Sequence, residues 1–157
     1  MSAHIRITSS AAIVQEGHIL VIVFDDENGI HYNLPGGGSD PGETLQETVI
    51  REIREETRAE VATVGRLLLT WEYEPERYQK VYGKRHKVGF VFACELKPGS
   101  TPMLPDNPDP YQVGVKWLPL AELPTAHLYP AMGEELIAAL NDEPAQHLDL
   151  YEIDDGQ

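Results

Sequence analysis

Three glutamates in one charged segment, Glu52, Glu55 and Glu56, occupy positions where solvated charges are not expected. On a helical wheel with about 100° per residue, the apolar side chains of the segment form one arc, made of Leu45, Val49, Ile50 and Ile53. Glu52 and Glu56 fall roughly 20° to either side of Leu45, inside this arc or at its edge. Carboxylates turned inward need cations, and three at i, i+3 and i+4 repel one another unless a hard divalent ion lies between them. The spacing therefore points to a divalent metal site.

The alternative interpretation of this segment is an ordinary solvated helix face. Residues 51–56 read Arg-Glu-Ile-Arg-Glu-Glu, and Arg51 and Glu55 have the i,i+4 spacing of a surface ion pair. Solvated carboxylates should avoid the apolar arc, however, and Glu52 and Glu56 do not. The geometry therefore favours carboxylates that face the interior.

A loop rich in glycine and proline, residues 36–43, comes directly before the charged segment. Glycine has no Cβ and tolerates positive φ, so a loop of this composition can bring its backbone close to a ligand. Glu43 and Thr44 suit a helix N-terminus, where they meet unpaired N–H groups and the positive end of the helix dipole. The sequence predicts a ligand-binding loop followed at once by a helix.

The loop and the segment together resemble the signature of the Nudix (MutT-like) hydrolase family. The matching positions are Gly37, Glu43, Arg51, Glu52, Ile53, Glu55, Glu56 and Ala59. One position departs from the signature, because Arg58 stands where the family has its second glycine. Glycine there would end the helix in a left-handed cap, so arginine predicts a different helix ending. We expect the metal site to be retained, because Arg58 is not a ligand.

The resemblance implies a role for each acidic residue. Glu52, Glu55 and Glu56 would bind Mg²⁺ or Mn²⁺ together with a backbone carbonyl near Gly37 or Gly36, and Glu52 or Glu55 would also take part in activating water. Arg51 would orient the carboxylates through its fork of donors, and Glu43 would brace the site through Arg51. A divalent ion held in this way neutralises phosphate charge and lowers the pKa of bound water.

The implied activity is that of a pyrophosphatase: metal-dependent hydrolysis of a diphosphate bond in a nucleoside diphosphate derivative. Nucleoside triphosphates, dinucleoside polyphosphates and sugar nucleotides form the leading substrate class. One alternative is a non-catalytic module that senses a nucleotide or ADP-ribose. Another is a Nudix isomerase acting on a prenyl diphosphate, which would need a cysteine placed for proton transfer. Cys94 is a poor candidate for that role, because it lies in the centre of an expected strand.

The general base is not fixed by the sequence. Some family members use a glutamate from the loop before the last strand, and the nearest equivalent here is Gln112. An amide does not accept a proton usefully at neutral pH. Asp106, Asp109 or a glutamate of the helix remain as alternatives.

A basic loop stands out in this acidic chain. It holds five of the 12 basic residues, namely Arg77, Lys80, Lys84, Arg85 and Lys87. One interpretation is a clamp for substrate phosphates, helped by Tyr78 or Tyr82, and the other is a solvated edge that discourages aggregation. Trp71, Tyr73 or Tyr78 would be the aromatic residues available to stack on a base.

The charge and cysteine content of the chain narrow the classes of binding partner. Twenty-six acidic residues against 12 basic ones give a net charge of −14, which disfavours nonspecific binding to nucleic acid or to anionic membranes. No export signal or membrane-spanning run is apparent. Cys94 is the only cysteine and is expected to be a buried apolar residue, so a reducing cytoplasm is the expected location. The expected partner is a small nucleotide, and the resemblance makes a homodimer a common assembly.

The elements that must position these residues alternate around the charged helix. Strands are expected over residues 5–14, 19–24, 30–35, 61–73 (with a break near Gly65), 88–96 and 113–120. A last helix is expected over 131–141, with Pro130 in its first turn. Residues 1–157 are expected to form a single domain, an α/β/α sandwich with a central mixed β-sheet, with a loosely ordered acidic tail over about 143–157.

Overall fold

The computed structural model describes residues 4–77 and 83–150. Its strands form one mixed sheet in the order β3-β2-β1-β6-β5-β8, with β4 paired to β1 and β7 paired to β2. The bounds are β1 Arg6–Gln15, β2 His18–Asp26, β3 Gly29–Asn33, β4 Gly36–Gly38, β5 Val61–Tyr73, β6 Lys87–Leu96, β7 Gln112–Pro119 and β8 Gln146–Asp149. The β1–β6 and β5–β8 pairs are parallel, whereas the other pairs are antiparallel.

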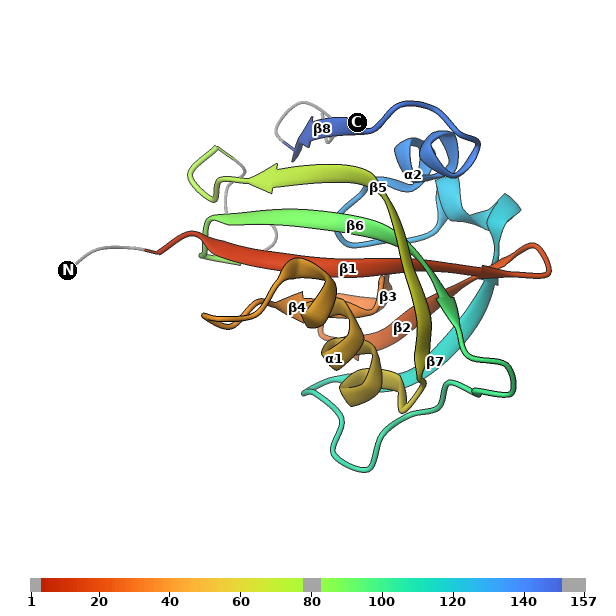
Figure 1. The fold of residues 1–157 in the computed structure, drawn as a ribbon. Coiled ribbons are helices and arrows are strands. Elements are labelled where there is room, and N and C mark those ends of the chain that lie inside the picture. Colours follow the sequence, from red (N-terminus) through yellow and green to blue (C-terminus); the bar gives the residue numbers. More distant parts are fainter. Residues whose placement is uncertain (1–3, 78–82, 151–157) are drawn as a thin grey trace.

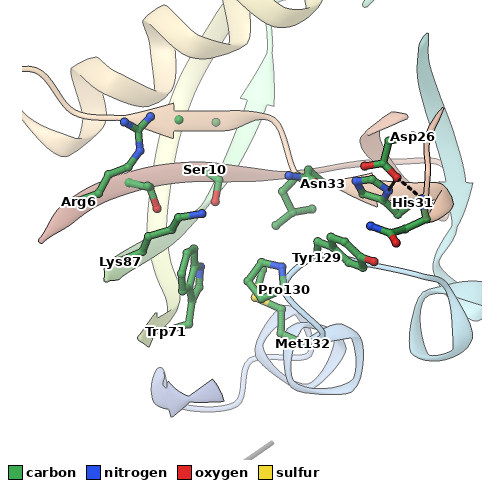
Figure 2. A pocket seen from close by; sticks show the side chains of 15 residues that line it. Arg6, Ser10, Asp26, His31, Asn33, Trp71, Lys87, Tyr129, Pro130 and Met132 are labelled. Atoms are coloured by element: carbon green, nitrogen blue, oxygen red, sulfur yellow. Dashed lines mark hydrogen bonds and ion pairs between the residues drawn. The ribbon is translucent and has the colours of Figure 1, made fainter. Parts of the chain in front are cut away.

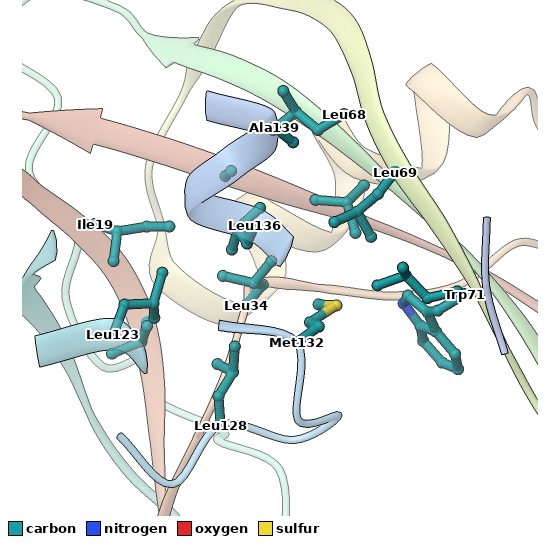
Figure 3. Packing of buried hydrophobic residues seen from close by; sticks show 14 of the residues in the cluster. Ile19, Leu34, Leu68, Leu69, Trp71, Leu123, Leu128, Met132, Leu136 and Ala139 are labelled. Atoms are coloured by element: carbon teal, nitrogen blue, oxygen red, sulfur yellow. The ribbon is translucent and has the colours of Figure 1, made fainter. Parts of the chain in front are cut away.

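Helices cover both faces of this sheet (Figure 1). The helix α1, Leu45–Thr57, packs on one face, and α2, Gly133–Leu140, packs on the other beside the 3₁₀ helix η1, Leu120–Thr125. Two hydrophobic clusters fill the space between the layers. The cluster under α2 contains Trp71, Met132 and Leu136 (Figure 3), and the cluster under α1 contains Val49 and Ile53. The predicted α/β/α sandwich around a mixed sheet is confirmed.

The start of α1 is fixed by its own sequence. Thr44 is the N-cap residue, and its Oγ1 accepts a hydrogen bond from the Glu47 N–H at 3.1 Å, while Glu47 Oε1 accepts from the Thr44 N–H at 2.9 Å. This reciprocal capping box satisfies two backbone donors that the helix leaves without partners. Glu52, Glu55 and Glu56 follow about two to three turns later, so a fixed helix start helps to fix their positions.

The end of α1 differs from the prediction. Arg58 adopts the left-handed conformation, with φ 63° and ψ 5°, and its N–H donates to the Arg54 carbonyl at 2.9 Å. The expectation of a different helix ending is therefore wrong. A non-glycine residue in this region costs about 1–2 kcal/mol. Here that cost is offset by tertiary contacts, because Ala59 is fully buried directly afterwards and the Thr57 carbonyl accepts from the Met103 N–H at 2.8 Å.

Two expectations in the first half of the chain need correction. Gly36–Gly38 was expected to lie in a loop, but it forms β4, which pairs antiparallel with residues 8–10 of β1. Gly65 does not break β5, because the strand continues through it with a register shift between Val64 and Leu67. The strands predicted elsewhere in the sheet are confirmed to within a few residues.

The C-terminal part also departs from the prediction. The last helix begins at Gly133, and Pro130 precedes it after a cis Tyr129–Pro130 peptide bond. Residues 146–149, expected to be loosely ordered, form β8 alongside β5, and Leu148 is buried. Trp117 is half-buried at the edge of the cluster under α1. Within residues 4–77 and 83–150, no helix is long and apolar enough to cross a membrane.

Candidate functional site

The glycine strand β4 separates two hollows of the surface. A Cβ on Gly37 would lie 2.5 Å from Cδ of Glu52, on the α1 side of the strand. A Cβ on Gly36 would lie 2.4 Å from Cβ of Ser10, and one on Gly38 would lie 2.6 Å from Cζ of Arg6, both on the β1 side. None of the three has a positive φ, so glycine is required here by close approach and not by backbone conformation.

On the α1 side, Arg51 ties the acidic residues together. Its Nε and Nη2 donate to the two carboxylate oxygens of Glu43 at 2.6 and 3.0 Å, a bidentate pair. Its Nη1 donates to Glu52 at 2.9 Å and to Glu55 at 3.2 Å, and its Nη2 also reaches the Gly38 carbonyl at 2.9 Å. One guanidinium therefore holds the loop, the helix and the glycine strand in register.

Glu43 is itself held from several directions. Its carboxylate accepts hydrogen bonds from the Asp40 N–H at 3.0 Å and from the Thr48 hydroxyl at 2.9 Å, in addition to those from Arg51. The Arg51 guanidinium lowers the pKa of Glu43 to about 2, and the Asp40 N–H acts in the same direction. Glu43 is therefore a permanently ionised brace behind the cluster.

Glu56 is the most deeply buried acid of the helix. Its relative exposure is 9%, and its Oε1 accepts a hydrogen bond from the Gly36 N–H at 2.7 Å. Burial raises its pKa to about 8, with further upward contributions from the nearby Glu52 and Asp109 carboxylates. Without a metal ion this carboxyl therefore holds a proton at neutral pH.

Glu52 and Glu55 lie beside Glu56, and their side chains are exposed to different degrees. The Glu52 side chain is 15% exposed, and burial raises its pKa against the lowering effect of Arg51, whereas the Glu55 side chain is 58% exposed. The predicted inward orientation is thus confirmed for Glu52 and Glu56, while Glu55 lies at the outer edge.

A cavity of about 460 Å³ opens beside these glutamates. Its donor groups are mostly oxygens, from Glu52, Glu55, Glu56, Asp106, Asn107, Asp109 and Gln112. Oxygen donors of this kind are those that Mg²⁺ and Mn²⁺ prefer, so the residues present fit a hard divalent ion. In this conformation Arg51 binds Glu52 and Glu55, and no three His, Cys, Asp or Glu side chains of the described residues converge on one point.

Gln112 bridges α1 and the proline-rich loop, which is the segment over residues 97–111 between β6 and β7. Its Nε2 donates to the Glu56 carbonyl at 3.2 Å, and its Oε1 accepts from the Asp109 N–H at 3.2 Å. It is buried and makes structural contacts, which is consistent with the expectation that it is not the base. Asp109 lies near enough to Glu52 and Glu56 to raise their pKa values, whereas Asp106 is 90% exposed and 3.8 Å from Arg58.

On the β1 side, a cavity of about 430 Å³ reaches from the glycine strand across the sheet (Figure 2). Its floor includes Arg6, Thr8 and Ser10, alternate residues of β1 that share one face of the strand. The walls come from distant segments: Lys87 and Trp71 stand at one end, and Asp26, His31 and Tyr129 stand at the other. Gly36 and Gly37 line this cavity too, and both also border the carboxylate cluster, since Gly36 donates to Glu56 and Gly37 closely approaches Glu52.

His31 belongs to the wall of this cavity and not to the polar surface of a loop. It is buried in β3, and its ring stacks on Tyr129 at 4.3 Å and on Phe24 at 5.5 Å between centroids. Asp26 Oδ1 lies 4.0 Å from its Nδ1. No local sequence pattern predicts this stack, because Tyr129 is almost 100 residues away from His31 in the chain.

The predicted clamp is only partly assembled at this cavity. Lys87 lines it, whereas Arg77, Lys84 and Arg85 are exposed and line neither of the two cavities. Tyr78, Lys80 and Tyr82 lie outside the described residues.

Two of the aromatic residues considered for base stacking are within the described part of the chain. Trp71 lines the cavity, but Tyr73 is fully buried and its hydroxyl donates to the Gly83 carbonyl at 2.6 Å. Arg6 was missed at the sequence level. The polar residues Arg6, Thr8 and Ser10 alternate along one face of the expected strand, and this pattern could have identified Arg6.

Comparison with known proteins gives a family match and close structural similarities. A model described as the NUDIX domain matches residues 5–140. A MutT NUDIX hydrolase from Burkholderia pseudomallei is 26% identical, with 85% of this chain and 97% of that chain covered and a TM-score of 0.67. An ADP-ribose pyrophosphatase from Streptococcus suis 89-1591 is 21% identical (93% and 99% covered, TM-score 0.64). A UDP-X diphosphatase is 22% identical (95% and 69% covered, TM-score 0.70).

Proposed function

The chain belongs to the Nudix family, and from this premise we propose that it is a divalent-metal-dependent pyrophosphohydrolase. Its substrate would be a nucleoside diphosphate derivative: a nucleoside triphosphate, a dinucleoside polyphosphate or a sugar nucleotide. Solved structures similar to this chain include proteins named as an ADP-ribose pyrophosphatase and a UDP-X diphosphatase, which is consistent with this class.

The observation that carries the proposal is the pair of buried carboxylates on α1. Glu52 and Glu56 are held in the interior beside Glu55, next to a cavity whose donors are mainly oxygens. Buried acids are costly unless a cation compensates them. Among the described residues, Arg51 is the one cation that pairs with Glu43, Glu52 and Glu55. Glu52, Glu55 and Glu56, with the carbonyl of Gly37, would hold Mg²⁺ or Mn²⁺. The ion would neutralise phosphate charge and make bound water more acidic.

The surrounding residues have supporting roles in this proposal. Arg51 and Glu43 are positioning residues, because they fix the directions of Glu52 and Glu55 through the bonds described above. Asp109 is the residue we propose as proton acceptor for the attacking water, since it faces Glu52 and Glu56 across the cavity. Gln112 holds the Asp109 backbone in place.

The rest of the substrate would occupy the cavity on the β1 side, which shares Gly36 and Gly37 with the carboxylate edge. Of the predicted clamp, Lys87 is supported by its place in that wall, and Arg77, Lys84, Arg85 and Tyr78 remain proposals. We also propose that residues 1–157 act as one domain in a reducing cytoplasm. The buried Cys94 thiol, whose pKa burial raises to about 12, fits that compartment as an unreactive residue. We propose a homodimer as its assembly, which a measurement of the mass of the protein in solution would test.

The test is a screen of nucleoside triphosphates, dinucleoside polyphosphates and sugar nucleotides with Mg²⁺ or Mn²⁺, with products identified by phosphorus NMR. Turnover that yields a nucleoside monophosphate, and stops when the metal is chelated, would support the proposal. Release of orthophosphate or pyrophosphate would identify the bond attacked. Tight nucleotide binding with no turnover of any compound would contradict it and favour a sensing module.

A further inference from the structure

Two cationic side chains stand next to each other in the wall of the β1-side cavity. Arg6 of β1 and Lys87 of β6 are direct partners in the parallel register of these strands, so their side chains leave the sheet on the same face. Both line the cavity, and Figure 2 shows them on the same side of it, with Lys87 reaching toward Ser10 above the Trp71 ring. The pairing places two positive charges together in a chain whose net charge is −14.

We infer that Arg6 and Lys87 form an anion subsite that selects substrates with an anionic group beyond the two phosphates of the attacked bond. This inference rests on the proposed function and narrows its substrate class. Nucleoside triphosphates and dinucleoside polyphosphates carry such a group, whereas ADP-ribose and ADP-glucose do not. The enzyme therefore prefers substrates with three or more phosphates.

The positive charges of Arg6 and Lys87 repel each other. Arg6 is exposed and Lys87 is half-buried, so the charge of Lys87 gains less from water than that of an exposed lysine. Burial, followed by the positive charges of Arg6 and Arg85, lowers the pKa of Lys87, in keeping with the position of Lys87 beside Arg6 in the sheet. A bound anion between Arg6 and Lys87 turns this repulsion into two attractions and adds charge-assisted hydrogen bonds.

Arg6 also lies close to the carboxylate cluster. The Arg6 guanidinium lies against the backbone of Gly38, where a Cβ would come within 2.6 Å of its Cζ. Gly38 is also the residue whose carbonyl binds Arg51 on the carboxylate side. Arg6 therefore stands across one strand from the carboxylate cluster, where further phosphates of a chain bound at Glu52 would be close to it.

The opposite end of the cavity has different chemistry. It presents Asp26, Asn28 and Asn33 beside the stacked rings of His31 and Tyr129, which suits a polar aromatic ring better than a phosphate. In the described part of the chain, the two buried side-chain polar atoms without a hydrogen-bond partner are Asn33 Oδ1 and Trp71 Nε1. Both belong to residues that line this cavity, and unsatisfied buried polar atoms are concentrated at functional sites.

The experiment compares Arg6→Gln, Lys87→Gln and the double variant with wild type and with Lys97→Gln. Lys97 is a matched control, because it is an exposed lysine that lines neither cavity and pairs with Glu60 at the surface. The value of kcat/KM is measured with Mg²⁺ for ATP, diadenosine tetraphosphate, ADP-ribose and ADP-glucose, which share the adenosine group. In parallel, calorimetry measures binding of inorganic tripolyphosphate without divalent metal, and thermal unfolding checks that each variant is folded.

The inference predicts that wild type prefers ATP or diadenosine tetraphosphate. In the double variant, kcat/KM for these two substrates should fall roughly 10- to 100-fold through KM, which is about tenfold more than it falls for ADP-ribose and ADP-glucose. Tripolyphosphate binding should be lost in the double variant and kept in Lys97→Gln. Equal losses for all four substrates, a wild-type preference for the two sugar nucleotides, or unchanged tripolyphosphate binding would each overturn it. Loss of the proposed function looks different: no compound is hydrolysed, yet tripolyphosphate binding still depends on Arg6 and Lys87.

Discussion

The two sides of the glycine strand are built in different ways. On the α1 side, the acidic cluster comes from one short stretch of chain, residues 43–56, and most of its polar groups already have partners around Arg51. On the β1 side, the cavity is assembled from strands and loops far apart in sequence, and it contains two buried polar atoms without partners. The first side is organised for fixed chemistry, whereas the second leaves contacts for a ligand to complete.

This contrast suggests a division of labour. The acidic side would determine whether a diphosphate bond is hydrolysed, and the cavity side would determine which molecule is accepted. Variants on the α1 side should therefore act mainly on kcat, whereas variants in the cavity should act mainly on KM.

The largest effect is expected from Glu56→Gln. The amide keeps the shape and its oxygen can still accept from the Gly36 N–H, but it removes the negative charge that would bind the ion. We expect kcat to fall by roughly 100-fold or more, as measured in steady-state assays with Mg²⁺, with little change in thermal stability. Glu134→Gln, an exposed acid on α2, serves as the control and should behave as wild type. Full activity of Glu56→Gln would count against a role for this residue in the metal site.

A single methyl group tests how closely the strand must approach the cluster. In Gly37→Ala the new Cβ would lie 2.5–2.7 Å from the Glu52 carboxylate, so that side chain must move. We expect kcat to drop roughly 10- to 100-fold and the free energy of unfolding to fall by about 1–3 kcal/mol. Gly114→Ala is the matched control, because its Cβ would meet nothing within 4 Å. Similar behaviour of the two variants, in activity and chemical denaturation, would show that the close approach is not required.

A smaller effect separates the two aspartates of the proline-rich loop. Both are exposed, but Asp109 is close enough to the buried glutamates to raise their pKa values, whereas Asp106 lies near Arg58. If Asp109 accepts a proton, Asp109→Asn should lower both kcat and kcat/KM by roughly 10- to 100-fold. Asp106→Asn should leave both unchanged. The reverse result, or two silent variants, would return the role of base to a helix glutamate.

The smallest effect is on stability and follows from the pKa of Glu56. Because burial raises this pKa to about 8 in the folded protein, the folded state binds more protons than the unfolded state between about pH 4.5 and pH 8. Metal-free protein should therefore lose stability as the pH rises through this window. Scanning calorimetry should show a steeper fall in Tm for wild type than for Glu56→Gln, and Mn²⁺ should raise the wild-type Tm more at pH 8 than at pH 6. Parallel pH curves for the two proteins would contradict this expectation.

Sequence reasoning was strongest where the structure is local. The helix N-terminus at Thr44 follows from local residue types, and the inward positions of Glu52 and Glu56 follow from helical periodicity over a few turns. The positions of most strands along the chain were also predictable, because runs such as 19–24 are apolar enough to require burial on both faces. These features depend on neighbours in the chain, so spacing alone carries the information.

It failed where long-range contacts outweigh local preference. Arg58 accepts a left-handed conformation because Ala59 is buried behind it, and Gly36–Gly38 becomes a strand because β1 offers it a partner. The acidic composition of the tail concealed Leu148, a residue of β8 that is buried in the cluster under α2. The cavity was unpredictable for the same reason, because contacts between His31 and Tyr129 exist only after folding.

The central claim is that α1 and the glycine strand together hold a divalent ion. The most direct measurement is anomalous diffraction from a crystal soaked in Mn²⁺ above pH 8, where the Glu56 carboxyl is ionised. We predict a single strong peak bounded by the carboxylates of Glu52, Glu55 and Glu56 and the Gly37 carbonyl, with the Arg51–Glu43 pair retained. A fully ordered site with no peak there, or a peak only among surface carboxylates elsewhere, would contradict the account.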